Sequence, residues 1–273
     1  MNIIEKLQKL VQIPSVSYNE EEVARWIFDY LKGKGIETEM RGWNTQCRIP
    51  GRDSSRAVIF NGHTDTVAAG ELSLWKHPPS GPGAGVVEDG KLYGLGSSDM
   101  KAALAAFMEV AEKYHDTVPP VDLFFCFVTE EEVSGRGSDE YVQYFSSEWH
   151  GKYDDVICIV GEPTSFQYIE LGNRGVRHFE LNVEGVACHA AQAAGKTTNA
   201  PEIAVEAIKR VDALKADWLM RFQHEKLGLP AVTLTAMNSS ESSSNAVPSH
   251  VRLLWDIRTT PDLHDKVELL LKE

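Results

Sequence analysis

The fold is decided by the stretch Ala57-Val58-Ile59-Phe60-Asn61-Gly62-His63-Thr64-Asp65-Thr66. Its first half is an apolar run, and its second half holds an imidazole and a carboxylate two residues apart. In an extended segment, residues i and i+2 point to the same side, so His63 and Asp65 can face one site. The Asp65 carboxylate can then hold the imidazole through its second nitrogen, as the neighbours of metal-bound histidines do. A lone His-x-Asp is more often a surface turn, so the interpretation depends on further acidic residues placed in the same way.

Two later segments repeat the apolar run. Residues 121–128 and 155–160 are predicted to be buried strands, and residues at helical spacing separate them. Nearly continuous apolar strands that alternate with helices indicate an α/β fold with a largely parallel sheet. A strand is also expected near residues 37–41, and a helix capped by Asn19 is expected to run toward Gly33. Residues 68–98, rich in glycine and proline, predict a long ordered loop of functional importance.

Acidic side chains stand where the predicted strands end. The Glu130–Glu132 triplet follows 121–128, Glu162 follows 155–160, and Asp99 precedes a predicted helix. Ligands of open α/β sheets bind outside the carboxyl ends of the strands, so these residues and His63 can converge on one crevice. Carboxylates gathered without matching Lys or Arg repel one another unless a divalent cation binds, and His with carboxylate ligands suits zinc, cobalt or manganese.

Each acidic position also has a simpler structural interpretation. Asp99 could cap the helix that follows it, the Glu130–Glu132 triplet could be a solvated turn, and Glu162 before Pro163 could be a loop carboxylate. Taken singly, these explanations are preferred. The shared placement of all these residues at strand ends or a helix start is what favours a metal site.

Composition argues against several classes of function. A net charge of -13 over 273 residues argues against a nucleic-acid-binding surface, which needs clustered Lys and Arg. No apolar run approaches the roughly 20 residues of a membrane span, and the N-terminus does not resemble a signal peptide. The four cysteines lack C-x-x-C spacing and are predicted to be reduced, buried side chains of a cytoplasmic protein; they are Cys47, Cys126, Cys158 and Cys188.

The chain resembles the M20 family of metallopeptidases and amidohydrolases, which includes acetylornithine deacetylase, succinyl-diaminopimelate desuccinylase, aminoacylase-1 and glutamate carboxypeptidase. The matching stretches follow the order of the family and are specific together: Gly62-His63-Thr64-Asp65-Thr66, Gly94-Leu95-Gly96-Ser97-Ser98-Asp99-Met100-Lys101, Thr129-Glu130-Glu131-Glu132, Gly161-Glu162-Pro163-Thr164 and Gly185-Val186-Ala187-Cys188-His189. The resemblance implies a zinc-peptidase catalytic domain at residues 1–172 and a smaller β-α-β-β-α, ferredoxin-like lid domain at residues 173–273.

The resemblance also implies a set of metal ligands. His63 and Glu162 resemble the ligands of one ion, Asp99 resembles the carboxylate that bridges two ions, and Glu132 resembles a ligand of the second. One or two Zn2+ ions are implied, with Co2+ or Mn2+ as alternatives. Family members also carry a cis peptide after the bridging Asp, which would lie at Asp99-Met100.

Two further residues are implied to act in catalysis beside the ligands. Asp65 is similar to the residue that orients the histidine. Glu131 is similar to the general base that takes a proton from the attacking water and later passes it to the leaving amine. The alignment within the acidic triplet depends on the downstream Gly137-Ser138, which matches the family's spacing.

The lid domain is implied to form a homodimer and to contact the substrate. His189 resembles the lid histidine that stabilises the tetrahedral intermediate. Motif positions associated with lid structure or with the substrate carboxylate are Arg174, Asn199, Asn245 and Arg258. An Arg fork can bind both oxygens of a carboxylate. Arg258 could instead form a structural pair with Asp256.

The sequence departs from the family pattern in one respect. Family members return from the lid to the catalytic domain and supply a last histidine ligand, whereas this sequence ends at Glu273 within the expected last lid helix. None of His224, His250 and His264 has the context of that ligand. The predicted sheet is therefore expected to expose apolar surface, and the chain is expected to be a fragment or to have the gap filled by another subunit, a water or a rearrangement.

The function expected from all these features is zinc-dependent hydrolysis of an amide bond in an N-acyl amino acid, most like acetylornithine deacetylase. A dipeptidase or carboxypeptidase of the same family, acting on a short peptide, is the enzymatic alternative. The alternative without enzymatic activity is a truncated or inactive homologue that binds metal.

Overall fold

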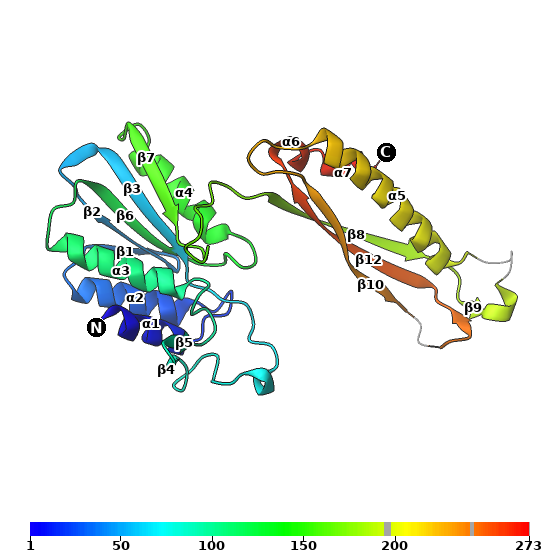
Figure 1. Cartoon of the computed structure of the whole chain (residues 1–273), viewed down its shortest axis with the longest axis horizontal. Coiled ribbons are helices and arrows are strands. Elements are labelled where there is room, and N and C mark those ends of the chain that lie inside the picture. The colour runs from blue at the N-terminus through cyan, green and yellow to red at the C-terminus, as the bar shows by residue number, and fades with distance from the viewer. Residues whose placement is uncertain (194–197, 241–242, 273) are drawn as a thin grey trace. The chain divides into compact units, whose positions relative to one another are not determined.

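The structure is a computed structural model, and it describes residues 1–193, 198–240 and 243–272 (Figure 1). The chain divides into two compact units, Met1–Tyr168 and Ile169–Glu273. Each unit has its own hydrophobic core. Among the described residues, no helix combines the length and the apolar character that crossing a membrane requires.

The first unit is built on a mixed sheet whose strands lie in the order β1-β2-β6-β3-β7. Strand β3 pairs in parallel with both β6 and β7, which confirms the predicted parallel centre. Strands β2 and β1 continue the sheet in antiparallel fashion. The strand bounds are β1 Thr38–Arg41, β2 Asn44–Ile49, β3 Asp53–His63, β6 Val121–Val128 and β7 Asp155–Val160.

Helices cover both faces of this sheet (Figure 1). On one face, α1 (Ile3–Gln12), α2 (Glu21–Gly33) and α3 (Lys101–His115) pack on residues such as Phe125 and Phe127. On the other, α4 (Arg136–Trp149) packs aromatic residues against Phe124. The predicted cap of α2 at Asn19 is wrong, because the helix begins after Glu20, whose side chain makes no capping bond.

Strand β7 is exposed, although its apolar sequence predicted a buried strand. Val156, Ile157, Ile159 and Val160 are 41–55% exposed. The reason is position, because β7 is the edge of the sheet and α4 lies over β6 instead. Its Cys158 is likewise exposed and Cys188 is half-buried, so only Cys47 and Cys126 are the buried thiols that were predicted.

The long loop before α3 is ordered and holds short regular elements that the sequence did not predict. It contains the 3-10 turn η1 (Leu72–Leu74) and a hairpin of β4 (Val86–Glu88) and β5 (Lys91–Tyr93). Gln8 of α1 donates to the Gly85 carbonyl, which ties the loop to that helix.

The second unit is a three-stranded antiparallel sheet, in the order β10-β12-β8, covered by helix α5. Its main elements are β8 (Gly175–Glu184), α5 (Ala200–Arg221), β10 (Ala231–Ser239) and β12 (His250–Thr259). The last helix expected in this unit is divided into α6 (Pro261–His264) and α7 (Val267–Leu270). A small pair of β9 (Cys188–His189) and β11 (Ala246–Val247), with the turn η2 (Ala190–Gln192), extends one end.

Candidate metal centre

Two glycines bring the ends of β3 and β7 onto the start of α3. Gly62 precedes His63, and Gly161 precedes Glu162. A Cβ added at Gly62 would lie 2.7 Å from Met100 Cε, and one added at Gly161 would lie 2.8 Å from the same atom. Because larger residues would push the strands away, these glycines allow the ligands that follow them to approach α3.

His63 is the centre of an acidic cluster and is only 1% exposed. Its Nε2 lies 3.1 Å from Asp99 Oδ1 and 3.7 Å from Glu162 Oε1. Two groups of possible ligand atoms surround it, and in each group the atoms lie within 4.8 Å of one another. One group comes from His63, Asp99 and Glu132, and the other from His63, Glu131 and Glu162. The structure therefore brings together residues from separate segments that the sequence predicted to meet.

Asp65 holds the His63 imidazole mainly through its main chain. His63 Nδ1 lies 3.0 Å from the Asp65 carbonyl oxygen and 3.4 Å from Asp65 Oδ1. The sequence predicted the carboxylate as the partner, whereas the carbonyl makes the closer contact. In the neutral imidazole, which is the form that binds a metal, donation from Nδ1 to this carbonyl leaves Nε2 as the acceptor that faces Asp99 and Glu162.

The charges of the cluster shift its pKa values. Burial would lower the pKa of His63, but the neighbouring Asp65 and Glu162 raise it to about 9. Burial raises the pKa of Glu162, which reaches about 7 with the help of the Asp99 carboxylate. Burial and Asp99 also raise the pKa of Glu132. The carboxylates therefore repel one another, and positive charge placed among them would stabilise the cluster.

The donor set fits a divalent cation. An imidazole nitrogen and several carboxylate oxygens are ligands that zinc, cobalt and manganese accept. Asp99 is available as a ligand because it does not cap α3: the N-cap is Met100, and no side chain makes a capping bond there. The peptide bond between Asp99 and Met100 is cis, which confirms the prediction.

The acidic triplet divides its side chains between two roles. Glu130 accepts a hydrogen bond from Ser134 Oγ at 3.2 Å and lies 3.7 Å from Arg136. Glu131 and Glu132 instead contribute to the groups of ligand atoms around His63. This division agrees with the alignment that makes Glu131, and not Glu130, the candidate base.

Two polar residues that the sequence did not single out lie beside the cluster. Ser17 is 7% exposed and donates to Asp65, while Glu20 is 2% exposed and accepts from the Glu130 N–H. A glutamate at a helix start is ordinarily solvated, so its burial could not be read from local sequence. The signal that could have found it is the turn before α2, which holds several polar residues shortly after the amphipathic helix α1.

The candidate residues of the second unit form two groups at opposite ends of β8. His189, Asn199 and Asn245 lie near its carboxyl end, where the Asn245 carbonyl accepts from the Ala190 N–H. Arg174 and Arg258 lie near its start, and Arg258 pairs in register with Val176. At a rise of about 3.3 Å per residue, the two ends of β8 are roughly 30 Å apart.

Local contacts engage most of these side chains. Arg258 donates to Asp256 at 2.8 and 3.3 Å, which is the structural pair that the sequence left open. Arg174 donates to the Leu229 carbonyl, and Asn199 caps α5. The histidines to which no ligand role was assigned also contact neighbours within this unit: His224, His250 and His264.

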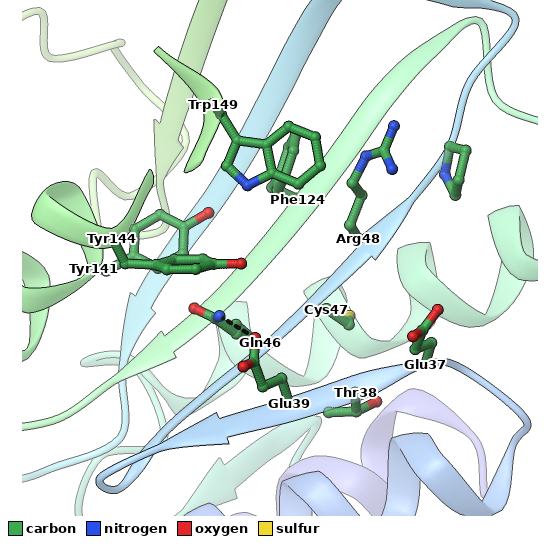
Figure 2. A pocket seen from close by; sticks show the side chains of 11 residues that line it. Glu37, Thr38, Glu39, Gln46, Cys47, Arg48, Phe124, Tyr141, Tyr144 and Trp149 are labelled. Atoms are coloured by element: carbon green, nitrogen blue, oxygen red, sulfur yellow. Dashed lines mark hydrogen bonds between the residues drawn. The ribbon is translucent and has the colours of Figure 1, made fainter. Parts of the chain in front are cut away.

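A cavity of about 570 Å³ lies on the face of the first sheet against which α4 packs (Figure 2). Aromatic side chains of α4 and the guanidinium of Arg48 line it, with Glu37 and Glu39 at its border. No residue of the His63 cluster lines this cavity, so it is separate from the candidate metal centre.

A family model described as Peptidase family M20/M25/M40 matches residues 59–252. Succinyl-diaminopimelate desuccinylase of Delftia acidovorans is 29% identical over 287 residues, which cover 97% of this chain and 71% of the relative. The protein of the same name from Buchnera aphidicola is 28% identical, with 99% of this chain and 72% of the relative covered. An M20 family metallo-carboxypeptidase from Sulfolobus solfataricus has a similar fold, with a TM-score of 0.76 at 19% identity over 100% of this chain and 74% of that one.

Proposed function

The chain belongs to peptidase family M20/M25/M40, and from this premise we propose that it hydrolyses the amide bond of an N-acyl amino acid at a divalent-cation site. The observation that carries the proposal is the approach of His63 Nε2 to the carboxylates of Asp99 and Glu162, at 3.1 and 3.7 Å. These residues follow or adjoin the carboxyl ends of parallel strands, where α/β enzymes bind their ligands.

The site is proposed to bind one or two Zn2+ ions, with Co2+ or Mn2+ as alternatives. With two ions bound, the ligands would be shared as follows. His63 and Glu162 would hold one ion, Glu132 would hold the other, and Asp99 would bridge them. When bound, such a cation polarises the scissile carbonyl and makes the attacking water more acidic.

Proton transfer is assigned to Glu131. Its side chain has a ligand-competent oxygen in the same group of atoms as His63 and Glu162, so it can reach a water held there. Glu131 would accept a proton from this water as it attacks and donate it to the departing amine. Asp65 would keep the imidazole of His63 in the orientation that ligation needs.

The substrate class is supported by the relatives. The sequence favoured a deacetylase most like acetylornithine deacetylase, whereas both reported relatives are named as desuccinylases, so acetyl and succinyl groups are the two candidates. A dipeptidase or carboxypeptidase is the second function, favoured by the metallo-carboxypeptidase of similar fold. An inactive metal-binding homologue is the alternative without catalysis.

The second unit is proposed to contact the substrate and to form the interface of a homodimer. His189 would stabilise the tetrahedral intermediate. Arg174, Asn199, Asn245 and Arg258 are the other proposed contacts, and the separation of the two groups along β8 favours His189, Asn199 and Asn245 as the set that serves one substrate. A cytoplasmic location is proposed on the basis of the free cysteines.

The test combines metal stoichiometry with turnover. The purified chain, stripped and reconstituted with zinc, is expected to bind one or two ions and to hydrolyse members of a panel of N-acetyl and N-succinyl amino acids and dipeptides. Glu131→Gln is expected to lower kcat at least about 100-fold while zinc remains bound. Glu130→Gln is the matched control, because its side chain faces Arg136. Zinc binding without turnover of any member would favour the inactive homologue.

A further inference from the structure

The backbone of the acidic triplet is held by two buried carboxylates. The Glu130 N–H donates to Glu20 Oε1 at 3.1 Å. The next two N–H groups, of Glu131 and Glu132, donate to Asp65 Oδ1 at 3.1 Å and Asp65 Oδ2 at 3.2 Å. Successive donors of one turn are thus aimed at acceptors behind the site, while the side chains of Glu131 and Glu132 face the cluster around His63.

Glu20 is directed at this turn rather than at its own helix. It immediately precedes α2, where a carboxylate ordinarily caps the helix or meets solvent, yet it makes no capping bond and is 2% exposed. A buried carboxylate needs hydrogen-bond donors, and one of its donors comes from Glu130, which lies 110 residues away in the sequence and has a positive φ of 60°. The contact therefore holds a backbone conformation that a glutamate rarely adopts.

Ser17 supports the other carboxylate. Its Oγ donates to Asp65 Oδ2 at 2.8 Å, and Ser17 itself is 7% exposed. The backbone around it lies beside the segment after β3, because the Thr66 N–H donates to the Ser15 carbonyl and the Ser17 N–H donates to the Thr66 carbonyl. The turn between α1 and α2 is thus fixed against the segment that carries Asp65.

We propose that Ser17 and Glu20 are positioning residues of the metal centre. Ser17 fixes the Asp65 carboxylate, and Glu20 with Asp65 fixes the triplet, so that Glu132 is aimed at a cation and Glu131 at the water that it activates. The assignment of those two side chains rests on the proposed function. The hydrogen bonds that carry the inference are independent of the proposed function.

Two substitutions test the two contacts independently. Ser17→Ala removes one donor from Asp65 Oδ2, and Glu20→Gln replaces a carboxylate oxygen that faces backbone donors with an NH2 group. Ser17→Thr restores the hydroxyl and is the rescue variant. Glu22→Gln, an exposed position in the first turn of α2, is the matched control for Glu20.

The experiment titrates the whole 273-residue chain with Co2+ and follows the visible absorption of the bound ion, with kcat, KM and Tm measured on the same preparations. Ser17→Ala and Glu20→Gln are expected to weaken Co2+ binding 10- to 100-fold or to lower kcat by a similar factor, as losses behind metal ligands typically do. KM should change less than about threefold, and Ser17→Thr and Glu22→Gln should resemble the wild type.

The opposite pattern would overturn the proposal. If Ser17→Ala and Glu20→Gln only lower Tm, and the folded proteins keep the wild-type Co2+ affinity, absorption spectrum and kcat, both residues serve stability alone. Failure of the wild type to hydrolyse any amide would reject the proposed function, and the Co2+ titration would still decide between a positioning and a stabilising role.

Discussion

Asp65 is fully buried, and each of its carboxylate oxygens meets donors from different parts of the chain. Oδ1 accepts from the Glu131 N–H and lies 3.4 Å from His63 Nδ1, while Oδ2 accepts from the Glu132 N–H and from Ser17 Oγ. Burial alone would raise the pKa of Asp65, but the hydrogen bonds from His63 and Ser17 hold it below its usual value. An ionised carboxylate therefore links the proposed base to the proposed ligand histidine.

Asp65→Asn removes the charge of the side chain and keeps its size, so it should show how much of the role of Asp65 is electrostatic. The amide NH2 would oppose one of the donors that now face the carboxylate, so the triplet or the imidazole must shift. We expect kcat to fall about 10- to 100-fold and zinc to be removed at lower chelator concentrations. Steady-state kinetics and a chelator titration measure both effects, with Asp89→Asn in the exposed turn between β4 and β5 as the control. Wild-type kcat in Asp65→Asn would exclude an orienting role for this residue.

Sequence could predict the residues that face a cation, but not those that face the backbone. His63, Asp99 and Glu162 were predicted because strand ends and helix starts in an α/β sheet converge by rule. Ser17 and Glu20 were missed because their partners are a distant carboxylate and a distant backbone N–H, which leave no periodic pattern. Neither contact follows from local propensity.

At the scale of elements, the amino end of β6 is tied to its neighbours through Asp122. Its carboxylate accepts from the Gly51 N–H at 2.7 Å, from the Tyr153 hydroxyl at 2.6 Å and from Arg48 Nη2 at 2.7 Å. Burial would raise the pKa of Asp122, but these donors lower it. The strand that leads to the acidic triplet is therefore anchored at its opposite end.

The stability contributed by Asp122 should depend on pH in the acid range. Because the folded pKa lies below the usual value of 3.8, the contribution is full above that value and is lost as pH falls through the lowered pKa. Asp122→Asn should lower the free energy of unfolding by about 1–3 kcal/mol at neutral pH and flatten its acid dependence. Urea unfolding at several pH values measures this, with exposed Asp29→Asn as the control; equal acid dependence in the wild type and Asp122→Asn would contradict the assignment.

The parallel centre of the sheet was predicted, and the strand expected near residues 37–41 is β1, whereas the antiparallel strand β2 between them was not predicted. Apolar runs in β3 and β6 are strong signals of buried strands. Strand β2 begins with Asn44, Thr45 and Gln46, which are buried because they bond to other elements: Thr45 to the Ala24 carbonyl and Asn44 to the Gly137 carbonyl. In the sequence, a stretch of such polar residues is typical of a loop and does not indicate a buried strand. Conversely, the apolar sequence of β7 could not reveal that the strand lies at an edge.

At the scale of the whole molecule, the chain consists of two compact units, and the side chains near their boundary are exposed. Each buries its own core, around residues such as Phe125 in the first and Trp255 in the second. Between them, Phe166, Tyr168 and Leu171 are 106%, 61% and 86% exposed. All the residues of the candidate metal centre lie in the first unit.

Brief digestion with chymotrypsin should therefore cut between residues 166 and 171 before it cuts within either unit. Exposed aromatic and leucine side chains in a segment outside regular structure are accessible to this protease. The N-terminal fragment is expected to retain bound zinc, measured by mass spectrometry of fragments and metal analysis after gel filtration. The undigested chain carried through the same steps is the control. Loss of zinc from an intact N-terminal fragment would mean that the second unit supplies a required ligand.

The exposed edge of the first sheet also bears on how the protein behaves in concentrated solution. Within the described residues, β7 hydrogen-bonds to β3 alone, so its outer row of backbone donors and acceptors is open beside apolar side chains such as Ile157 and Val160. An edge with that character is a template for intermolecular β-pairing, and proteins usually blunt it with charge or proline. None of the side chains from Val156 to Val160 carries such protection. Strand β7 should thus promote self-association of the protein into insoluble material.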